Sequence, residues 1–516
     1  MLDISKEPYK LIEPVSGTEG AYAALSYQWG GWAKFTTSMT LELSKKEIKP
    51  DSMPIVFQEL ATIAQTLGIH YLWIDSVCIV QDDDDDWREE AAKMANIYEH
   101  ASIVIAASCA PNPGTPILGK RSTPAPRAKS LATLGSRKVF MARKGLTCGI
   151  HANTNSKPKD PLDQRGWALQ EKELARRWFS YSAAETQWRC RTLQTCECCT
   201  VPSSSQAFLW DSARPIQELH DRWHVIVQEY TSRKLTQPTD KFPALIGVAN
   251  KFRELTQATY LAGLWKENIV NDLAWKRGSD SQFYPPPLSL APSFSWASIS
   301  GMVSYQPTRS SYSGTRTYHA QLIGSSASTA QGGSFAIANR ESKIILRGCI
   351  IDGTLSTSDA FNPSAYYLEV QSKKCISGVY FGPDKELSGC EFTVDTILEV
   401  QDDTNEEDSK NGSVKRLEPG HNSDLVGAFT AKPVKLLALD TFVTDDTVYE
   451  NFLILGRDRR QGSSYHRIGL GTGKSCKLDS YEGLVDSTYL FLWTLKEKIY
   501  QTAGLKDVST EDICIL

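Results

Sequence analysis

A glutamate lies within an otherwise apolar stripe in the segment RGWALQEKELARRW, residues 165–178. Four residues recur there at i, i+4, i+7 and i+11, the spacing of one face of a helix: Trp167, Glu171, Leu174 and Trp178. A carboxylate buried without a partner costs several kcal/mol or stays protonated, so Glu171 needs a partner, a pocket or a chemical task. Exposure at the helix rim would also explain it, as would a salt bridge to one of three nearby cations, Arg165, Lys172 or Arg176.

Polar residues also stand where three short apolar runs end. The runs cover residues 21–27, 71–74 and 103–107, and the last two lack polar alternation, as parallel strands covered on both faces do. A parallel sheet places its ligand at the carboxyl ends of its strands. We therefore expect a binding site around Asp75, Ser76, Cys78 and Ser108.

The elements that must position these residues follow one another as strand, helix, strand, helix, strand. Apolar residues at helical spacing over 54–68 predict a helix that ends at Gly68, and the run 87–101 predicts a second one with a single apolar face, Trp87, Ala91, Met94, Tyr98 and Ala101. The pair Asp86 and Glu89 fits a helix cap. Gly30 and Gly31 allow a sharp turn after the first strand. The first part of the chain is therefore predicted to be α/β with a parallel sheet.

At 516 residues the chain is too long for a single core. We predict an α/β domain over 1–210, a helical connector over 211–280, and an antiparallel β-rich domain over 281–516, where short β-branched stretches and Ser, Thr and Gly prevail. The polar tract 402–412 is predicted to be a loop within that last domain.

Charge and cysteine usage narrow the class of protein. The formal net charge is -4, with Lys and Arg scattered, so neither nucleic acid nor an anionic membrane is an expected partner. No run approaches the ~20 apolar residues of a membrane span, and the amino terminus has no secretory pattern. The 12 cysteines are then best interpreted as reduced thiols of a cytoplasmic protein.

Three further patterns are weak. GLGTGKS at 469–475 lacks the first glycine of a phosphate-binding loop, so a turn is predicted there. His220 and His224 stand one helical turn apart without a third metal ligand, and an exposed amphipathic helix explains them better. The four cysteines 190, 196, 198 and 199 lack paired C-x-x-C spacing. We therefore predict no metal site.

Three segments of the first part carry a family resemblance. ALSYQWG (24–30), YLWIDSVCIVQD with WREEAAKMANIYEHASIVIAAS (71–108), and RGWALQEKELARRWFSY (165–181) are similar to the three signature blocks of the fungal heterokaryon incompatibility domain. Later pieces resemble segments that follow this domain in long members: DKFPALIGVANKF, YLAGLWKENIVNDLAW and PSFSWASISG. The resemblance thus extends to about Gly301.

The resemblance implies a fold and an activity. The family triggers cell death when genetically different hyphae fuse. Its domain is similar to the Toll/interleukin-1 receptor fold, which is a flavodoxin-like parallel sheet. Several proteins with that receptor fold cleave NAD. The W-x-x-x-E pair of that relative falls on Trp167 and Glu171. This implies NAD as a substrate rather than a cofactor, with Glu171 stabilising an oxocarbenium-like state.

Other residues at the strand ends would then contact the substrate. Trp167, Tyr27 or Trp29 could stack on a flat ring, and polar contacts could come from Ser26, Asp75 and Ser108. For each of them, ordinary packing or turn formation is at least as good an explanation. Self-association and a partner protein of the incompatibility reaction are expected. One alternative is a non-enzymatic adaptor whose α/β domain only recruits proteins, and another is a degenerate copy with neither activity.

Overall fold

The computed structural model describes residues 1–15, 17–31, 36–119, 129–134, 137–141, 160–197, 214–278, 291–305, 314–326, 342–357, 366–370, 373–376, 390–394, 432–443, 447–457, 464–476 and 510–515. Its contacts divide the described residues into two compact units, one from Met1 to Ala258 and the other from Thr259 onward. The tract 402–412 lies outside the described residues, and so do Cys198 and Cys199.

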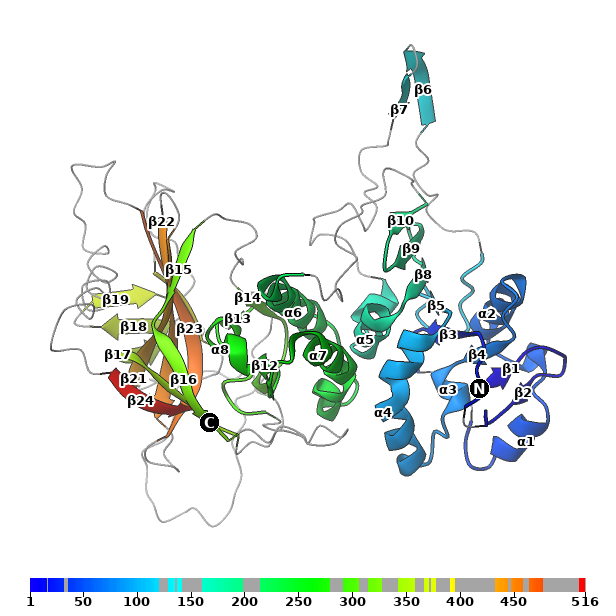
Figure 1. Cartoon of the computed structure of the whole chain (residues 1–516), viewed down its shortest axis with the longest axis horizontal. Helices are drawn as coiled ribbons and strands as arrows, with labels where there is room; N and C mark the ends of the chain where they lie inside the picture. Colours follow the sequence, from blue (N-terminus) through cyan, green and yellow to red (C-terminus); the bar gives the residue numbers. More distant parts are fainter. Residues whose placement is uncertain are drawn as a thin grey trace, which may run out of the picture. The chain divides into compact units, whose positions relative to one another are not determined.

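The first unit is built on an eight-stranded mixed sheet (Figure 1). Its strands are β1 (Leu2–Asp3), β2 (Lys10–Leu11), β3 (Tyr22–Ser26), β4 (Tyr71–Trp73), β5 (Ile103–Ala106), β8 (Arg177–Tyr181), β9 (Thr186–Cys190) and β10 (Gln194–Cys196), in the spatial order β10-β9-β8-β5-β3-β4-β1-β2. The four central strands, β4, β3, β5 and β8, run parallel. The pairs at either edge are antiparallel. The predicted parallel sheet therefore exists, but only as the centre of a mixed one.

Helices cover both faces of this sheet because the central strands are apolar on both sides. Helix α2 (Ile55–Thr66) packs on one face in a core with Leu25, Tyr27 and Ile105. Helices α4 (Asp84–His100) and α5 (Trp167–Leu174) lie on the other face with Ala24, Val104 and Ala106 (Figure 1). Short helices complete the unit: α1 (Leu41–Lys46), α3 (Asp75–Cys78) and the 3₁₀ turns η1 (Pro50–Ser52) and η2 (Pro161–Gln164). Strands β6 (Lys129–Leu134) and β7 (Arg137–Met141) form a separate hairpin.

The predicted turns and caps are largely as expected. Gly30, Gly31 and Gly68 all have positive φ, so each stands where only a residue without a side chain is unstrained. The cap of α4 was predicted wrongly, since Asp83 rather than Asp86 accepts hydrogen bonds from the first-turn amides. Trp87 was predicted on the buried face of that helix but is 40% exposed.

The helix predicted from the apolar stripe of residues 165–178 is shorter in the structure. Helix α5 ends at Leu174, and Ala175 is extended with φ -56° and ψ 127°. Trp178 therefore lies in strand β8, paired with Val104 of β5, and does not continue the helical stripe. Pairing with β5 satisfies a row of backbone groups that a longer helix would leave open at that edge of the sheet.

Two longer helices complete the first unit. They are α6 (Ile216–Thr231) and α7 (Pro243–Thr256), joined by the 3₁₀ turn η3 (Pro238–Lys241). Helix α7 packs against both α5 and α4, and α6 packs against α7. Of the helical connector predicted over 211–280, α6 and α7 thus belong to the same compact unit as the sheet, whereas its residues from Thr259 onward belong to the second unit.

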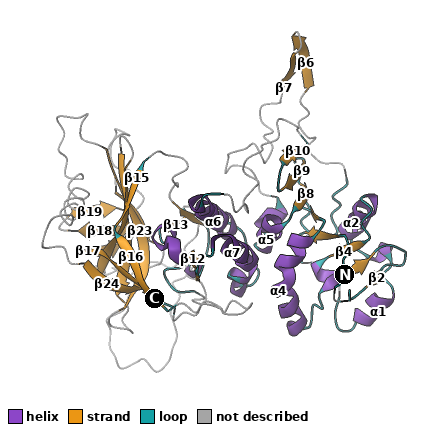
Figure 2. Cartoon of the chain, in the orientation of Figure 1, coloured by secondary structure: helices purple, strands orange, loops and turns teal. Residues whose placement is uncertain are grey.

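The described residues of the second unit are mostly strand (Figure 2). Ten strands form one sheet: β15 (Thr315–Tyr318), β16 (Ala320–Ser325), β17 (Ile344–Thr357), β18 (Tyr366–Val370), β19 (Lys373–Ile376), β20 (Cys390–Val394), β21 (Lys432–Val443), β22 (Thr447–Arg457), β23 (Ser464–Cys476) and β24 (Thr510–Ile515). The pairings are antiparallel except between β23 and β24, as the sequence predicted for this half. The motif GLGTGKS lies inside β23, so neither a phosphate loop nor the predicted turn is present.

Smaller elements precede that sheet in the second unit. They include two short antiparallel pairs, β11 (Tyr260–Leu261) with β12 (Leu264–Trp265) and β13 (Trp275–Arg277) with β14 (Val303–Tyr305). The others are the helix α8 (Ile269–Asp272) and the 3₁₀ turns η4 (Lys266–Asn268) and η5 (Trp296–Ser298). Among the helices described in either unit, none is long and apolar enough to cross a bilayer.

Candidate functional site

The carboxyl ends of the central strands bring the predicted site residues to one edge of the sheet. Ser26 is the last residue of β3, Asp75 follows β4, and Ser108 follows β5. In the register of the sheet, Ser26 lies opposite Ala106, and Ala106 lies opposite Ser180 of β8. The parallel arrangement predicted from apolar runs is what places these polar groups together.

Arg165 connects three of the groups at this edge. Its Nη2 lies 3.1 Å from Asp75 Oδ2, and its Nη1 donates to the carbonyl of Tyr27 at 2.8 Å. The same Nη1 lies 3.5 Å from Glu171 Oε1. Of the three cations that the sequence offered as partners for Glu171, Arg165 is therefore one that pairs with it. Its side chain is 20% exposed, so both ion pairs are largely withdrawn from water.

Glu171 is completely buried, with 0% of its surface exposed. Among the described residues, neither of its carboxylate oxygens has a hydrogen-bond partner. Burial raises the pKa of Glu171 above its ordinary value, and the attraction of Arg165 only partly offsets that rise. The position thus holds a buried carboxyl group that interacts with Arg165 at 3.5 Å, and whose pKa Ser26 and Tyr98 also lower, although no contact among the described residues has the geometry of an ordinary hydrogen bond.

Asp75 is buried as well, but it is well satisfied. Its Oδ2 accepts from Trp29 Nε1 at 2.9 Å as well as from Arg165, and its Oδ1 accepts from the amide of Ser76 at 2.7 Å. A carboxylate with this many donors is held in one orientation. We infer that Asp75 fixes the position of Arg165 beside Glu171.

The predicted ring-stacking residues have other contacts in this structure. The Tyr27 hydroxyl donates to Ser76 Oγ at 2.7 Å, and its ring packs edge-on against Phe57 on the α2 side of the sheet. Trp167 Nε1 donates to Asp240 Oδ2 at 3.0 Å, in the turn η3. Ser108 Oγ lies 2.7 Å from Ser180 Oγ. These contacts are compatible with packing and leave the assignment of substrate contacts a prediction.

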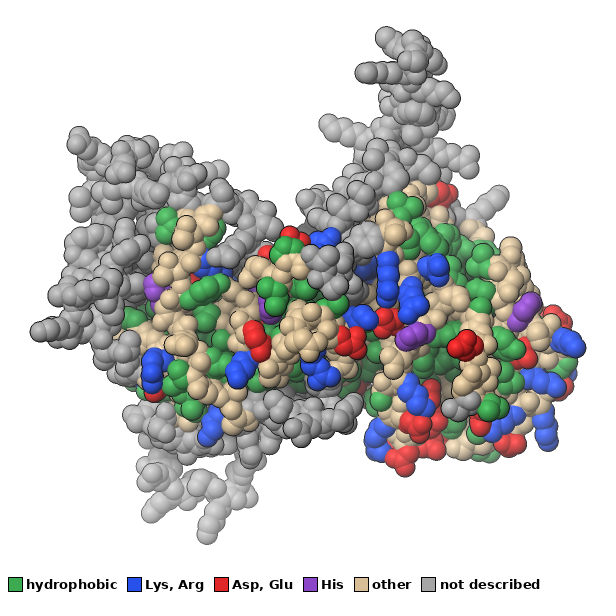
Figure 3. All heavy atoms as spheres, in the orientation of Figure 1, with side chains coloured by type: hydrophobic (Ala, Val, Ile, Leu, Met, Phe, Trp, Pro, Cys, Tyr) green, Lys and Arg blue, Asp and Glu red, His purple; other side chains and the backbone are tan. Residues whose placement is uncertain are grey.

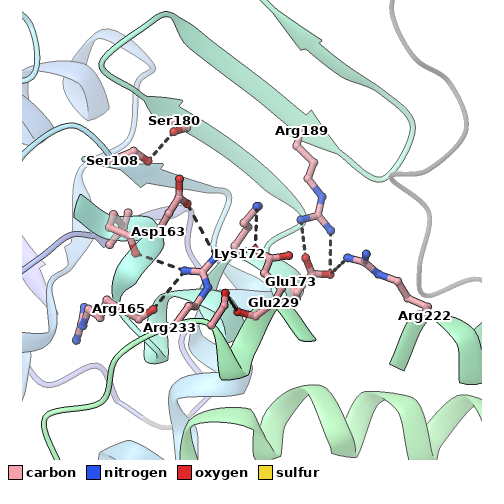
Figure 4. A network of polar contacts seen from close by, with 12 residues as sticks. Ser108, Asp163, Arg165, Lys172, Glu173, Ser180, Arg189, Arg222, Glu229 and Arg233 are labelled. Carbon is pink, nitrogen blue, oxygen red and sulfur yellow. Dashed lines mark hydrogen bonds and ion pairs between the residues drawn. The ribbon is translucent and has the colours of Figure 1, made fainter. Parts of the chain in front are cut away.

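A second polar network lies two residues further along α5 (Figure 4). Glu173 receives both arms of Arg189, at 3.0 and 3.2 Å, and Arg222 Nη2 at 3.1 Å. Burial alone would raise the pKa of Glu173, but these two guanidinium groups outweigh that effect and lower it to about 2. Sequence reasoning missed this network because its members come from α5, β9 and α6, separated by tens of residues.

No group of three metal-ligating side chains occurs in the part of the chain that the structure describes. His220 and His224 are buried on α6, so their assignment to an exposed helix was wrong. Cys190 and Cys196 are both free thiols. On the face drawn in Figure 3, acidic side chains lie beside basic ones over the first unit, as expected from the scattered charges of the sequence.

Comparison with known proteins gives one match. Residues 22–171 match the family model of the heterokaryon incompatibility protein (HET), so the chain carries this domain. Neither the curated proteins nor the solved structures contain a match. The match begins at β3 and ends at Glu171, the buried carboxylate of the site.

Proposed function

We propose that this heterokaryon incompatibility domain protein induces regulated cell death, and that its first unit acts by hydrolysing NAD at the bond between nicotinamide and ribose. The family match supports the role in incompatibility and cell death. The enzymatic part rests on Glu171, a fully buried carboxyl group near the carboxyl ends of parallel strands, which lies 3.5 Å from Arg165 but makes no hydrogen bond of ordinary geometry among the described residues.

The strand order also supports a nucleotide-binding site at this edge. If the parallel strands are counted along the chain as β3, β4, β5 and β8, their spatial order is 2-1-3-4, as in flavodoxin-like sheets. Such sheets bind ligands where the order reverses, which here is between β3 and β5. Ser26 and Ser108 stand at the ends of those two strands. This likeness extends the proposal to a fold similar to the Toll/interleukin-1 receptor domain.

The proposed reaction needs one carboxylate beside the ribose. The bond from ribose C1′ to the nicotinamide nitrogen breaks, its electron pair goes to the nicotinamide ring, and the ribose passes through an oxocarbenium-like state. The ionised Glu171 would stabilise that cation, and water would then add to C1′ and release a proton, giving ADP-ribose. Arg165 would keep part of the Glu171 population ionised, since its charge opposes the effect of burial.

Full burial of Glu171 places a condition on this proposal. A substrate could reach the carboxylate only after the groups that cover it had moved, so the proposal requires an open form in addition to this one. Self-association in the cytoplasm, or contact with an incompatibility partner, would supply the energy for opening.

The second proposed function is a non-enzymatic adaptor. The ion pair between Arg165 and Glu171 at 3.5 Å favours it, because a structural salt bridge explains a buried glutamate without any substrate. In that case the α/β unit would serve for self-association alone.

The experiment compares nicotinamide release from NAD by the full-length protein and two variants. Glu171→Gln removes the proposed catalytic charge, and Glu89→Gln removes an exposed carboxylate of α4 that pairs only with Lys93 among the described ion pairs. Release by the parent and by Glu89→Gln, but not by Glu171→Gln, supports the hydrolase. Cell death on expression of all three with NAD intact would overturn it in favour of the adaptor.

A further inference from the structure

Helix α5 and the turn before it are attached to one later stretch of the chain, residues 216–256. The attachment begins in the backbone. The amide of Gly166 donates to the carbonyl of Lys234 at 2.8 Å, and the amide of Lys234 donates to the carbonyl of Gln164 at 2.6 Å. A Cβ on Gly166 would lie 2.4 Å from the Leu235 side chain and 3.2 Å from the Lys234 carbonyl oxygen, so any larger residue there would require Leu235 to shift.

Arg233 extends this attachment to the residues around Arg165. Its Nη1 donates to the carbonyls of Leu162 and Arg165, at 3.4 and 3.2 Å, and its Nη2 donates to Glu229 Oε1 at 2.7 Å (Figure 4). The side chain of Arg233 is 2% exposed. A buried planar guanidinium with three acceptors has one orientation, so it fixes the backbone from which the Arg165 side chain departs.

Four side chains of α5 meet the same stretch. Trp167 donates to Asp240, Lys172 pairs with Glu229 at 3.6 Å, and Glu173 pairs with Arg222. Gln170 Oε1 accepts from the amide of Gly247 at 2.6 Å. These contacts surround the single turn of helix that carries Glu171.

Close packing at Gly247 makes this contact specific. A Cβ there would lie 2.4 Å from Ala95 of α4 and 2.7 Å from Gln170 Oε1. Helix α7 therefore approaches α4 and α5 at a point where its own backbone is the contact surface, and a helix with a side chain at that position could not sit as close.

We propose that residues 216–256 form a clamp that positions Arg165 and Glu171, with Arg233 and Asp240 as its positioning residues. Arg233 holds the carbonyl of the residue whose guanidinium pairs with Glu171, and Asp240 holds the first residue of the helix that carries it. The clamp lies outside the residues that match the family model. Its effect on catalysis rests on the proposed NAD hydrolysis, but its effect on α5 does not.

The test uses the full-length protein with Arg233→Gln and a matched control, Arg253→Gln. Arg253 belongs to the same stretch, but it is exposed on α7 and donates to Asn250 of its own helix. Arg233→Gln is expected to lower kcat for NAD cleavage at least tenfold while KM changes less than about threefold, because misplacement of a catalytic group by about 1 Å is enough for such a loss. Amide hydrogen exchange over residues 167–174 should accelerate at least tenfold, whereas exchange in α2 stays at the parental rate.

The two readouts separate this inference from the proposed function. If the parent releases no nicotinamide, the hydrolase fails, and faster exchange in α5 with Arg233→Gln but not Arg253→Gln still supports the clamp. Parental exchange in α5 together with parental kcat would overturn it. If Arg233→Gln does not fold, Asp240→Ala, which removes one half-buried acceptor of Trp167, is judged by the same two criteria.

Discussion

Replacing Arg165 with glutamine would show how much the first unit depends on the ion pairs at its site. Glutamine retains an NH₂ donor for the carbonyl of Tyr27 but removes the positive charge from between Asp75 and Glu171. Two buried carboxylates would then lie near each other without the cation that is 3.1 Å from Asp75 and 3.5 Å from Glu171 in the parent. We expect the variant to reach the folded state but to have a lower Tm than the parent.

The expected magnitude follows from the burial of the pairs. Removing one partner of a buried ion pair costs about 3–5 kcal/mol, and the 20% exposure of Arg165 places this case near the lower end, at about 3 kcal/mol. For a unit of this size, each kcal/mol shifts Tm by roughly 2–4 °C, so Tm should fall by about 6–12 °C. Arg88→Gln is the control, because its pair with Asp85 is exposed and should contribute less than about 1 kcal/mol.

The loss of folding stability in Arg165→Gln should also depend on pH. Without Arg165, burial raises the pKa of Glu171 further in the folded state, which then binds more protons than the unfolded state. The stability of such a protein falls as pH increases, so the deficit of Arg165→Gln should be larger at pH 7 than at pH 5. Adding Glu171→Gln to Arg165→Gln should restore part of the loss, since it removes one of the two uncompensated charges.

Thermal unfolding followed by tryptophan fluorescence measures all of these variants, with Trp29 reporting directly because its indole donates to Asp75. A change in Tm below about 2 °C, equal at pH 5 and pH 7, would refute the reasoning. It would mean that Glu171 is already neutral in the parent or that water reaches the ion pairs.

Two further results are expected. Arg189 and Arg222 hold the pKa of Glu173 at about 2 against an ordinary 4.5. The ion pairs of Glu173 therefore stabilise the unit fully above pH 4.5, and this stabilisation, on the order of 3 kcal/mol, is lost as pH falls toward 2. Acid unfolding of Glu173→Gln should lack this contribution. An acid transition of that variant identical to the parent's would contradict this. A fragment of residues 1–258 should unfold cooperatively, whereas a fragment ending at residue 210 should not, because it lacks Arg222, Arg233 and Gly247. Equal cooperativity of the two fragments by differential scanning calorimetry would count against a unit that includes α6 and α7.

Local patterns of the sequence predicted what local physics determines. The apolar runs of β4 and β5 and the spacing of Met94 and Tyr98 in α4 depend on neighbours within one turn or one strand, and the structure confirms them. The position of Asp75 at a strand end follows from the same patterns. A cation from the neighbouring sequence also pairs with Glu171, as one of the alternatives for that residue required.

The features that the sequence did not predict depend on contacts between residues far apart in the chain. The stripe ending in Trp178 continues the helical period, but β8 pairs with β5, and that pairing ends the helix at Leu174. Nothing near Trp167 or Glu173 in the sequence indicates that their partners are Asp240 and Arg222. Such partners are brought together only by the packing of α7 on α4 and α5.

The extent of the family match differs from the extent of the folded unit, and the difference bears on how the site works. The matched residues end at Glu171, in the middle of α5, before β8 has joined the sheet and before any residue of the clamp. A stretch that ends there leaves one edge of β5 unpaired and leaves Gln164, Leu162 and Gly166 without their partners in residues 233–234. Buried backbone groups require such partners, so the unit that positions Glu171 must reach at least to Lys234. The hydrogen bond from the Gly247 amide to Gln170 extends that unit into α7. It follows that any signal that loosens α6 or α7 would also loosen the only turn of helix that carries the proposed catalytic carboxylate.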